Sequence, residues 1–143
     1  MGDVMVDKEV VERLLGLLEE YVGDLESVQD ISFDEYKSTK QVKRFVERTL
    51  QIAIEACLDL GNHIIADEGL REPEDNKDVF KVLAEAGIID AKLLGSLQPM
   101  ASFRNLIVHD YGKIDDEIVF GILQRRLEDF REYSKMIVVH LRR

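Results

Sequence analysis

The sequence predicts an all-α protein, an up-and-down bundle of four to five helices, on three observations. Apolar residues recur at the three- and four-residue spacing of an amphipathic helix along almost the whole chain. The strict alternation of a half-buried β-strand is absent from the sequence. The 143 residues include only two prolines, and no glycine- or serine-rich linker divides them. Long helices joined by short connections therefore predict a bundle that forms a single domain over residues 1–143.

Capping residues define the first two expected helices. Asp7 is a favourable N-cap for a first amphipathic helix. A polar stretch follows it, with a short turn expected over residues 32–36. Ser38 and Gln41 have the spacing of a capping box, which predicts that the longest helix begins there, and Gly69 ends it.

The second half of the chain predicts three further helices. Residues 76–86 form a third, shorter helix that the next glycine ends, and Asp90 caps a fourth over residues 91–109. Asp115 caps a fifth. Pro99 lies inside the fourth helix, where it removes one backbone hydrogen bond at a cost of about 3 kcal/mol. We expect either a kink just before this proline or a new helix that begins at it.

The charge pattern describes an acidic protein with one basic stretch. Nineteen Lys and Arg residues stand against 29 Asp and Glu, a net charge of −10. Proteins that bind nucleic acid unaided are usually basic, because phosphate contacts supply most of the affinity. Residues 36–58 nevertheless carry five bases against Glu47 and Glu55. These bases are Lys37, Lys40, Lys43, Arg44 and Arg48. A local positive surface is compatible with this pattern, and the excess acid also suits a basic protein partner.

Cysteine usage and the N-terminal sequence predict a cytoplasmic location. Cys57 is the only cysteine, so no disulfide can form within the chain, and its apolar neighbours favour a core position. The N-terminus is acidic rather than basic and apolar, which excludes a signal peptide. The apolar runs are too short to span a bilayer.

Two polar rows mark a candidate site. On a helix, Gln98, Ser102, Asn105 and His109 form one row, and Arg104 and Tyr111 share the adjacent row. The expected long helix carries a matching row of Arg48, Gln51, Glu55, Asp59 and Asn62. If the two rows face each other or a second subunit, they line a cleft. By spacing alone, solvated helix faces or a satisfied core network explain these rows better than a site does, so spacing does not establish one.

The sequence from Arg104 to Tyr111 resembles the Arg-x4-His-x-Tyr signature of the HEPN superfamily. Its residues, Arg-Asn-Leu-Ile-Val-His-Asp-Tyr, are similar to those of the HepT branch in particular. The likeness extends to the long helix over residues 45–69 and to the connection that follows it, so that it covers about residues 40–130. Pro99 departs from the pattern. The resemblance implies an all-α toxin ribonuclease that cleaves RNA without a metal ion or another cofactor.

The residues suit that implied chemistry. RNA cleavage needs a base for the ribose 2′-hydroxyl, an acid for the leaving 5′-oxygen and a cation for the developing phosphorane. An imidazole such as His109 exchanges protons near neutral pH, and Arg104 binds phosphate oxygens in a bidentate manner. Asn105 is a candidate to orient the imidazole, with Arg48 and Glu55 as supporting residues.

The spacing of Arg104 and His109 predicts a site shared between two copies of the chain. Five residues separate the two positions by about 140° around an ideal helix, so they converge poorly on one face. One imidazole also serves poorly as both acid and base in the same step. A homodimer whose protomers pool their motifs at a twofold interface removes both difficulties.

The resemblance also implies a partner. In the HepT branch a minimal nucleotidyltransferase antitoxin of the MNT type transfers AMP to the tyrosine of the signature, which is Tyr111 here. The added phosphate would place negative charge beside Arg104 and obstruct RNA binding.

Two other functions remain open from the sequence. One is a non-catalytic module that holds a nucleotide or RNA for a partner nucleotidyltransferase, and the other is a structural helical subunit; the net charge of −10 favours both. A metal site is not expected, because His63, His109 and His140 lie in separate regions. No glycine-rich phosphate loop occurs.

Overall fold

The computed structural model describes residues 7–142, and within them the chain is entirely helical apart from its connections. The helices are α1 (Lys8–Glu26), α2 (Phe33–Ser38), α3 (Lys40–Asp67), α4 (Asn76–Glu85), α5 (Ala91–His109), α6 (Asp116–Arg125) and α7 (Leu127–Leu141), with a 3-10 turn η1 (Tyr111–Lys113) between α5 and α6. This confirms the predicted all-α class, with more helices than the four to five expected. Within the described residues, every helix is too short or too polar to cross a lipid bilayer.

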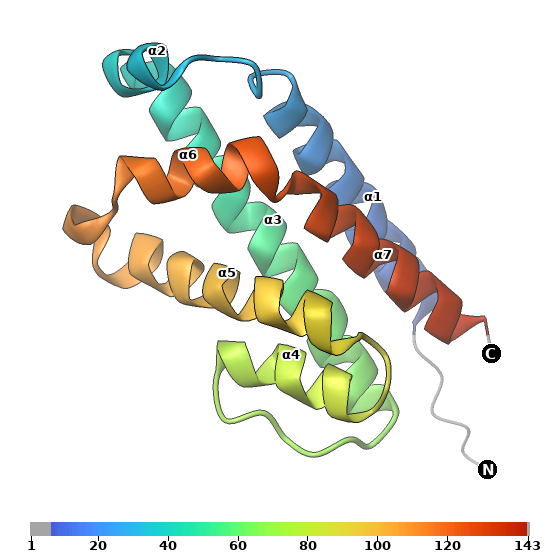
Figure 1. Cartoon of the computed structure of the whole chain (residues 1–143). Coiled ribbons are helices and arrows are strands. Elements are labelled where there is room, and N and C mark those ends of the chain that lie inside the picture. The colour runs from blue at the N-terminus through green and yellow to red at the C-terminus, as the bar shows by residue number, and fades with distance from the viewer. Residues whose placement is uncertain (1–6, 143) are drawn as a thin grey trace.

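Helix α3 is the centre of the bundle and packs against all six other α-helices. Figure 1 shows α1 and α7 side by side along one flank of α3, with α4 and α5 on another. The chain reverses direction between α5 and α6, so η1 lies at one end of the molecule (Figure 1). That end receives the C-terminus of α5, the start of α6 and the N-terminal half of α3. These elements position the candidate site.

The predicted boundaries agree with the structure where a capping side chain sets them. The carboxylates of Asp7, Asp90 and Asp115 each accept a backbone N–H in the first turn of α1, α5 and α6. Gly69 and Gly87 follow α3 and α4 with φ of 64° and 76°, the left-handed conformation that ends a helix.

The expected capping box at Ser38 is wrong. Ser38 is the last residue of α2, and its hydroxyl donates back to the carbonyls of Asp34 and Glu35. Helix α3 begins after Thr39, which makes no side-chain capping hydrogen bond. The expected turn over residues 32–36 is instead the start of a real helix, because Ser32 accepts the N–H of Glu35 and caps it.

Two helix breaks also differ from expectation. Helix α5 runs unbroken from Ala91 to His109 with Pro99 inside it, so no new helix begins at the proline. The expected fifth helix is divided at Arg126, whose φ of −120° separates α6 from α7. Arginine, unlike proline or glycine, is not a residue type that breaks helices, so the sequence at this position does not predict the break.

Two buried tyrosines differ in how their hydroxyls are satisfied. Tyr133 of α7 donates to the carbonyl of Cys57 in α3 at 2.7 Å, and its ring packs edge-on against Phe80 of α4. Tyr36 of α2 is equally buried, but its hydroxyl has no hydrogen-bond partner in the described part of the chain. Burial raises the pKa of both side chains, so both stay protonated.

We expect Tyr133→Phe to lower the free energy of unfolding by about 1 kcal/mol, because the variant loses one buried hydrogen bond between α7 and α3. Tyr36→Phe is the matched control and should leave the stability unchanged or slightly raise it, since it removes an unsatisfied hydroxyl. Urea unfolding followed by circular dichroism measures both variants. Equal losses of stability for the two would contradict the assignment of the interhelical bond.

Candidate functional site

Two carboxylates on α3 organise the candidate site. Glu47 and Glu55 are eight residues apart, which places them on one side of the helix with a rise of about 12 Å between them. Each holds a side chain from the end of α5 or from the turn after it: Glu55 binds Arg104, and Glu47 binds Tyr111. The long helix and the fourth helix do meet at Glu55, but through Arg104 of the adjacent row. Gln98 and Asn105 of the expected polar row hydrogen-bond to Lys77 and Asn76 of α4 instead.

Arg104 is fixed to α3 by an ion pair. Its Nε donates to Glu55 Oε2 at 3.0 Å, and Gln51 Nε2 donates to the same oxygen at 3.1 Å. The side chains of Arg104 and Glu55 keep 22% and 30% of their surface exposed. Such a pair orients the guanidinium without enclosing it, so the charge remains accessible to a ligand from solvent.

Asn105 takes a different role from the predicted one. Its Oδ1 accepts hydrogen bonds from Arg104 Nη1 at 3.2 Å and from Asn76 Nδ2 at 2.9 Å. The prediction that Asn105 orients the imidazole of His109 is wrong in this structure, because the amide oxygen is used to link α5 to the first residue of α4. Asn105 instead steadies Arg104 from the side opposite Glu55.

His109 is the last residue of α5, and Tyr111 lies beyond the end of that helix. Helix α5 ends at His109, whose side chain is exposed, and Asp110 leaves the helix with φ −150° and ψ 53°. Tyr111 belongs to η1 rather than to α5, so it does not share a helical row with Arg104 as expected. The structure therefore does not bring Arg104, His109 and Tyr111 together as one helix face.

Tyr111 is held in a small charged cluster. Its hydroxyl donates to Glu47 Oε1 at 2.5 Å, while its ring lies 5.2 Å from the guanidinium carbon of Arg44. Arg44 Nη1 also pairs with Glu47 Oε1 at 3.2 Å. Desolvation and the hydrogen bond to the carboxylate raise the pKa of Tyr111, although 43% of the residue is exposed. The cation beside Tyr111 is therefore Arg44 and not Arg104.

Arg48 stands apart from the Arg104–Glu55 pair and belongs to a basic surface. It lines a shallow depression of about 590 Å³ together with Lys40, Gln41, Arg44, Phe45 and Thr49. Phe45 is 40% exposed there, which is unusual for a phenylalanine. Three of the five bases of residues 36–58, Lys40, Arg44 and Arg48, thus share one local surface in an acidic chain, whereas Lys43 is paired with Asp116 and Lys37 lies over the ring of Phe33.

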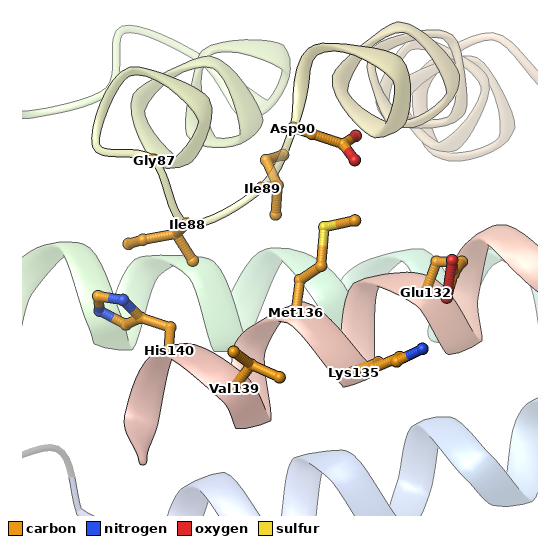
Figure 2. A pocket seen from close by; sticks show the side chains of 9 residues that line it. All are labelled: Gly87, Ile88, Ile89, Asp90, Glu132, Lys135, Met136, Val139 and His140. Carbon is orange, nitrogen blue, oxygen red and sulfur yellow. The ribbon is translucent and has the colours of Figure 1, made fainter. Parts of the chain in front are cut away.

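A second hollow, of about 470 Å³, lies far from these residues. Figure 2 shows Met136, Val139 and His140 of α7 beside Ile88 and Ile89 of the α4–α5 connection. It adjoins the N-terminus of α5, about 27 Å of helix away from His109. His140 is paired there with Glu68 at 2.6 Å. Within residues 7–142, no three His, Cys, Asp or Glu side chains gather as metal ligands would.

Sequence reasoning missed Glu47, Arg44 and Asn76 as site residues. Glu47 had a detectable signal, because it extends the row of Gln51 and Glu55 by one further turn. Its partner Tyr111 is 64 residues away and outside any helix periodicity, so the contact itself has no sequence signal. Asn76 was noted only as the start of a helix.

Comparison with known proteins assigns the family. The family model described as "Ribonuclease HepT-like" matches residues 18–137, which include Glu47, Glu55, Arg104, His109 and Tyr111. The chain belongs to the HepT-like ribonuclease family. Membership confirms the resemblance found in the sequence and places this HepT-like chain among enzymes that cleave RNA.

Relatives and a solved structure extend this comparison. The chain is 30% identical to an mRNA nuclease HepT of Shewanella oneidensis, over 96% of this chain and 98% of that protein. It is 27% identical to a tRNA nuclease HepT of Aphanizomenon flos-aquae, over 95% and 92% respectively. Its fold is similar to a tri-AMPylated Shewanella oneidensis HEPN toxin in complex with an MNT antitoxin, with a TM-score of 0.85, 27% identity, and coverage of 93% of this chain and 99% of that one.

Proposed function

We propose that this HepT-like chain is the toxin of a toxin–antitoxin pair, an endoribonuclease that cleaves RNA without a metal ion at a site shared by two copies in the cytoplasm. The observation that carries the proposal is Arg104, fixed by Glu55 and Asn105 yet open to solvent, five residues before an exposed His109. Nuclease relatives and a solved toxin–antitoxin complex of the same fold support it.

Arg104 is suited to stabilise the phosphorane that forms when the ribose 2′-oxygen attacks the adjacent phosphorus. Its Nε and Nη1 are used by Glu55 and Asn105, which leaves the Nη2 protons for a phosphate oxygen. Because both protein contacts hold the plane of the guanidinium, little reorganisation is needed when charge develops on the phosphate. Glu55 and Asn105 act here as positioning residues.

His109 supplies proton transfer. An imidazole at a helix C-terminus, exposed as His109 is, reaches a ligand on the surface rather than a group in its own chain's core. Two such imidazoles across a twofold axis provide one base for the 2′-hydroxyl and one acid for the 5′-oxygen. The exposed apolar side chains Val108 and Ile118 beside this end of the molecule give a second copy a surface to contact.

The basic depression gives the RNA backbone a place to lie. Lys40, Arg44 and Arg48 present positive charge along one side of α3, and Phe45 offers a ring on which an unpaired base can stack. This local surface answers the objection that a chain with a net charge of −10 should repel RNA. Arg48 thus supports binding rather than the chemical step.

Tyr111 is the proposed modification site of an MNT-type nucleotidyltransferase antitoxin. Tyr111 is partly exposed and belongs to η1, which lies at one end of the molecule (Figure 1), so a partner's active site can reach it. AMP on its hydroxyl would introduce a phosphodiester anion next to Arg44, at the edge of the basic depression. The added charge and bulk would oppose RNA binding there, which explains inactivation without any change of fold.

The purified chain, freed of any partner, should cleave single-stranded RNA in the presence of EDTA and leave 2′,3′-cyclic phosphate ends. Those ends follow from attack by the 2′-hydroxyl, because no water enters the first step. Electrophoresis and mass spectrometry of a labelled oligonucleotide measure both features. RNA that is bound but left intact by the wild-type dimer would instead support the non-catalytic binding module.

A further inference from the structure

Glu47 is a buried carboxylate to which the proposed RNA cleavage gives no role. Only 4% of its surface is exposed, and one oxygen, Oε1, accepts both the Tyr111 hydroxyl at 2.5 Å and Arg44 Nη1 at 3.2 Å. A buried carboxylate needs such partners to remain charged. Its contact with Tyr111, however, involves the oxygen atom that receives AMP, so Glu47 touches the reacting atom of the modification.

We infer that Glu47 is the general base that takes the hydroxyl proton of Tyr111 when AMP is transferred to it. The inference rests on the proposed modification of Tyr111. A tyrosine hydroxyl is a weak nucleophile at neutral pH, and the surroundings of Tyr111 raise its pKa, so free phenolate is scarce. A base within hydrogen-bond reach removes this obstacle, because the proton leaves as the new bond forms.

The step balances with ATP as the co-reactant. Tyr111 Oη attacks the α-phosphorus and forms the O–P bond, while the bond from that phosphorus to the bridging oxygen of the β-phosphate breaks. Pyrophosphate leaves with the electron pair. The hydroxyl proton moves along the existing 2.5 Å hydrogen bond to Glu47 Oε1 and then to solvent. The chain therefore brings its own base to the reaction and needs from the partner the nucleotide and its orientation.

Arg44 has an anionic partner both before and after the transfer of AMP. Before the reaction its charge is balanced by Glu47, and once Glu47 is protonated that balance is lost. The product places a phosphodiester anion on Tyr111, whose ring already lies against the guanidinium. Arg44, which is half-exposed, can thus exchange one anionic partner for the other without leaving the cluster.

The other ionisable neighbours of the cluster come from α2 and α6. Tyr36 of α2 lies beside Glu47 and Tyr111 without a hydrogen bond to either, and Asp116 of α6 is paired with Lys43 at 3.1 Å. Neither contacts Tyr111 Oη through a hydrogen bond, so Glu47 is the base that the geometry selects.

Glu47→Gln tests the inference. The variant and the wild-type chain are each combined with the nucleotidyltransferase and ATP, and their rates of AMP transfer are compared. The amide oxygen of glutamine can still accept the Tyr111 hydrogen bond but cannot take the proton. We expect the rate of AMP transfer at saturating ATP to fall about 10²-fold or more, with the KM for ATP unchanged. The residual rate should rise about tenfold per pH unit from pH 7 to 9, because it now depends on free phenolate, while the wild-type rate rises less steeply. Glu47→Asp should recover part of the rate.

Intact-protein and peptide mass spectrometry measure AMP on Tyr111 over time. The matched control is Tyr36→Phe, which changes a tyrosine next to the same carboxylate. This variant should receive AMP on Tyr111 at the wild-type rate. Equal rates and equal pH profiles for wild type and Glu47→Gln would overturn the role of Glu47 while leaving the modification intact. A wild-type Tyr111 that receives no AMP would overturn the proposed modification itself. If Glu47→Gln does not fold, Glu47→Asp replaces it as the test. Its carboxylate is set back from Tyr111 Oη by one methylene group, so AMP transfer should be slower than in wild type, and a wild-type rate would overturn the role of Glu47.

Discussion

His109→Ala should lower RNA cleavage about 10³-fold or more while RNA binding stays within a few-fold of wild type. The variant removes proton transfer from the reaction but leaves Arg104 and the basic depression untouched. Because His109 is exposed at the end of α5, its loss opens no cavity and should not lower stability measurably. His63→Ala, which removes an exposed histidine from α3, is the matched control and should keep full activity.

The same substitution tests whether the site belongs to two chains. A heterodimer of one wild-type and one His109→Ala chain can be made by cell-free co-expression with two different affinity tags and purified over both. If one site uses both imidazoles, this heterodimer is expected to be nearly inactive. Two independent sites would leave about half of the wild-type activity, because one complete site would remain. Half activity would therefore contradict the shared site, as would a monomer that cleaves RNA at the dimer's rate per chain.

The parts of the fold that the sequence predicts are those set by local chemistry. Asp90 and Gly87 locate the start of α5 and the end of α4 because a cap needs only a side chain and its own backbone. Ser38 shows the limit of such signals. Its hydroxyl could either accept an N–H at the start of α3 or donate to carbonyls in α2. In the structure it donates to the carbonyls of α2.

The candidate site also contains a part that local sequence patterns indicate and a part that they do not. Arg104 and Glu55 each lie on a helical row that can be read from periodicity, but the meeting of these two rows depends on how α5 packs against α3. The contact between Tyr111 and Glu47 depends on how Asp110 leaves the helix, which no spacing encodes. Asn105 was misassigned because its row pointed to His109, whereas the start of α4 supplies a nearer partner in Asn76.

Arg104→Ala should lower the cleavage rate about 10²- to 10³-fold, the usual effect of removing one preorganised donor from a developing oxyanion. The remaining Glu55 is partly exposed and therefore solvated, so we expect a loss of stability below about 1 kcal/mol. Arg104→Lys keeps the charge but loses the planar fork that Glu55 and Asn105 hold, and it should recover only a small part of the rate. Single-turnover kinetics on a labelled RNA measure these rates.

Glu55→Gln removes the negative charge beside Arg104 but keeps a hydrogen-bond acceptor for it. The amide still accepts one hydrogen bond from Arg104, but it no longer neutralises the guanidinium. RNA should therefore bind at least as tightly as to wild type, because one anion near the phosphate is gone. The single-turnover rate should fall about tenfold, because a neutral amide holds the guanidinium in place less strongly than a carboxylate does. If binding weakened in step with the rate, Glu55 would contact the RNA rather than position Arg104.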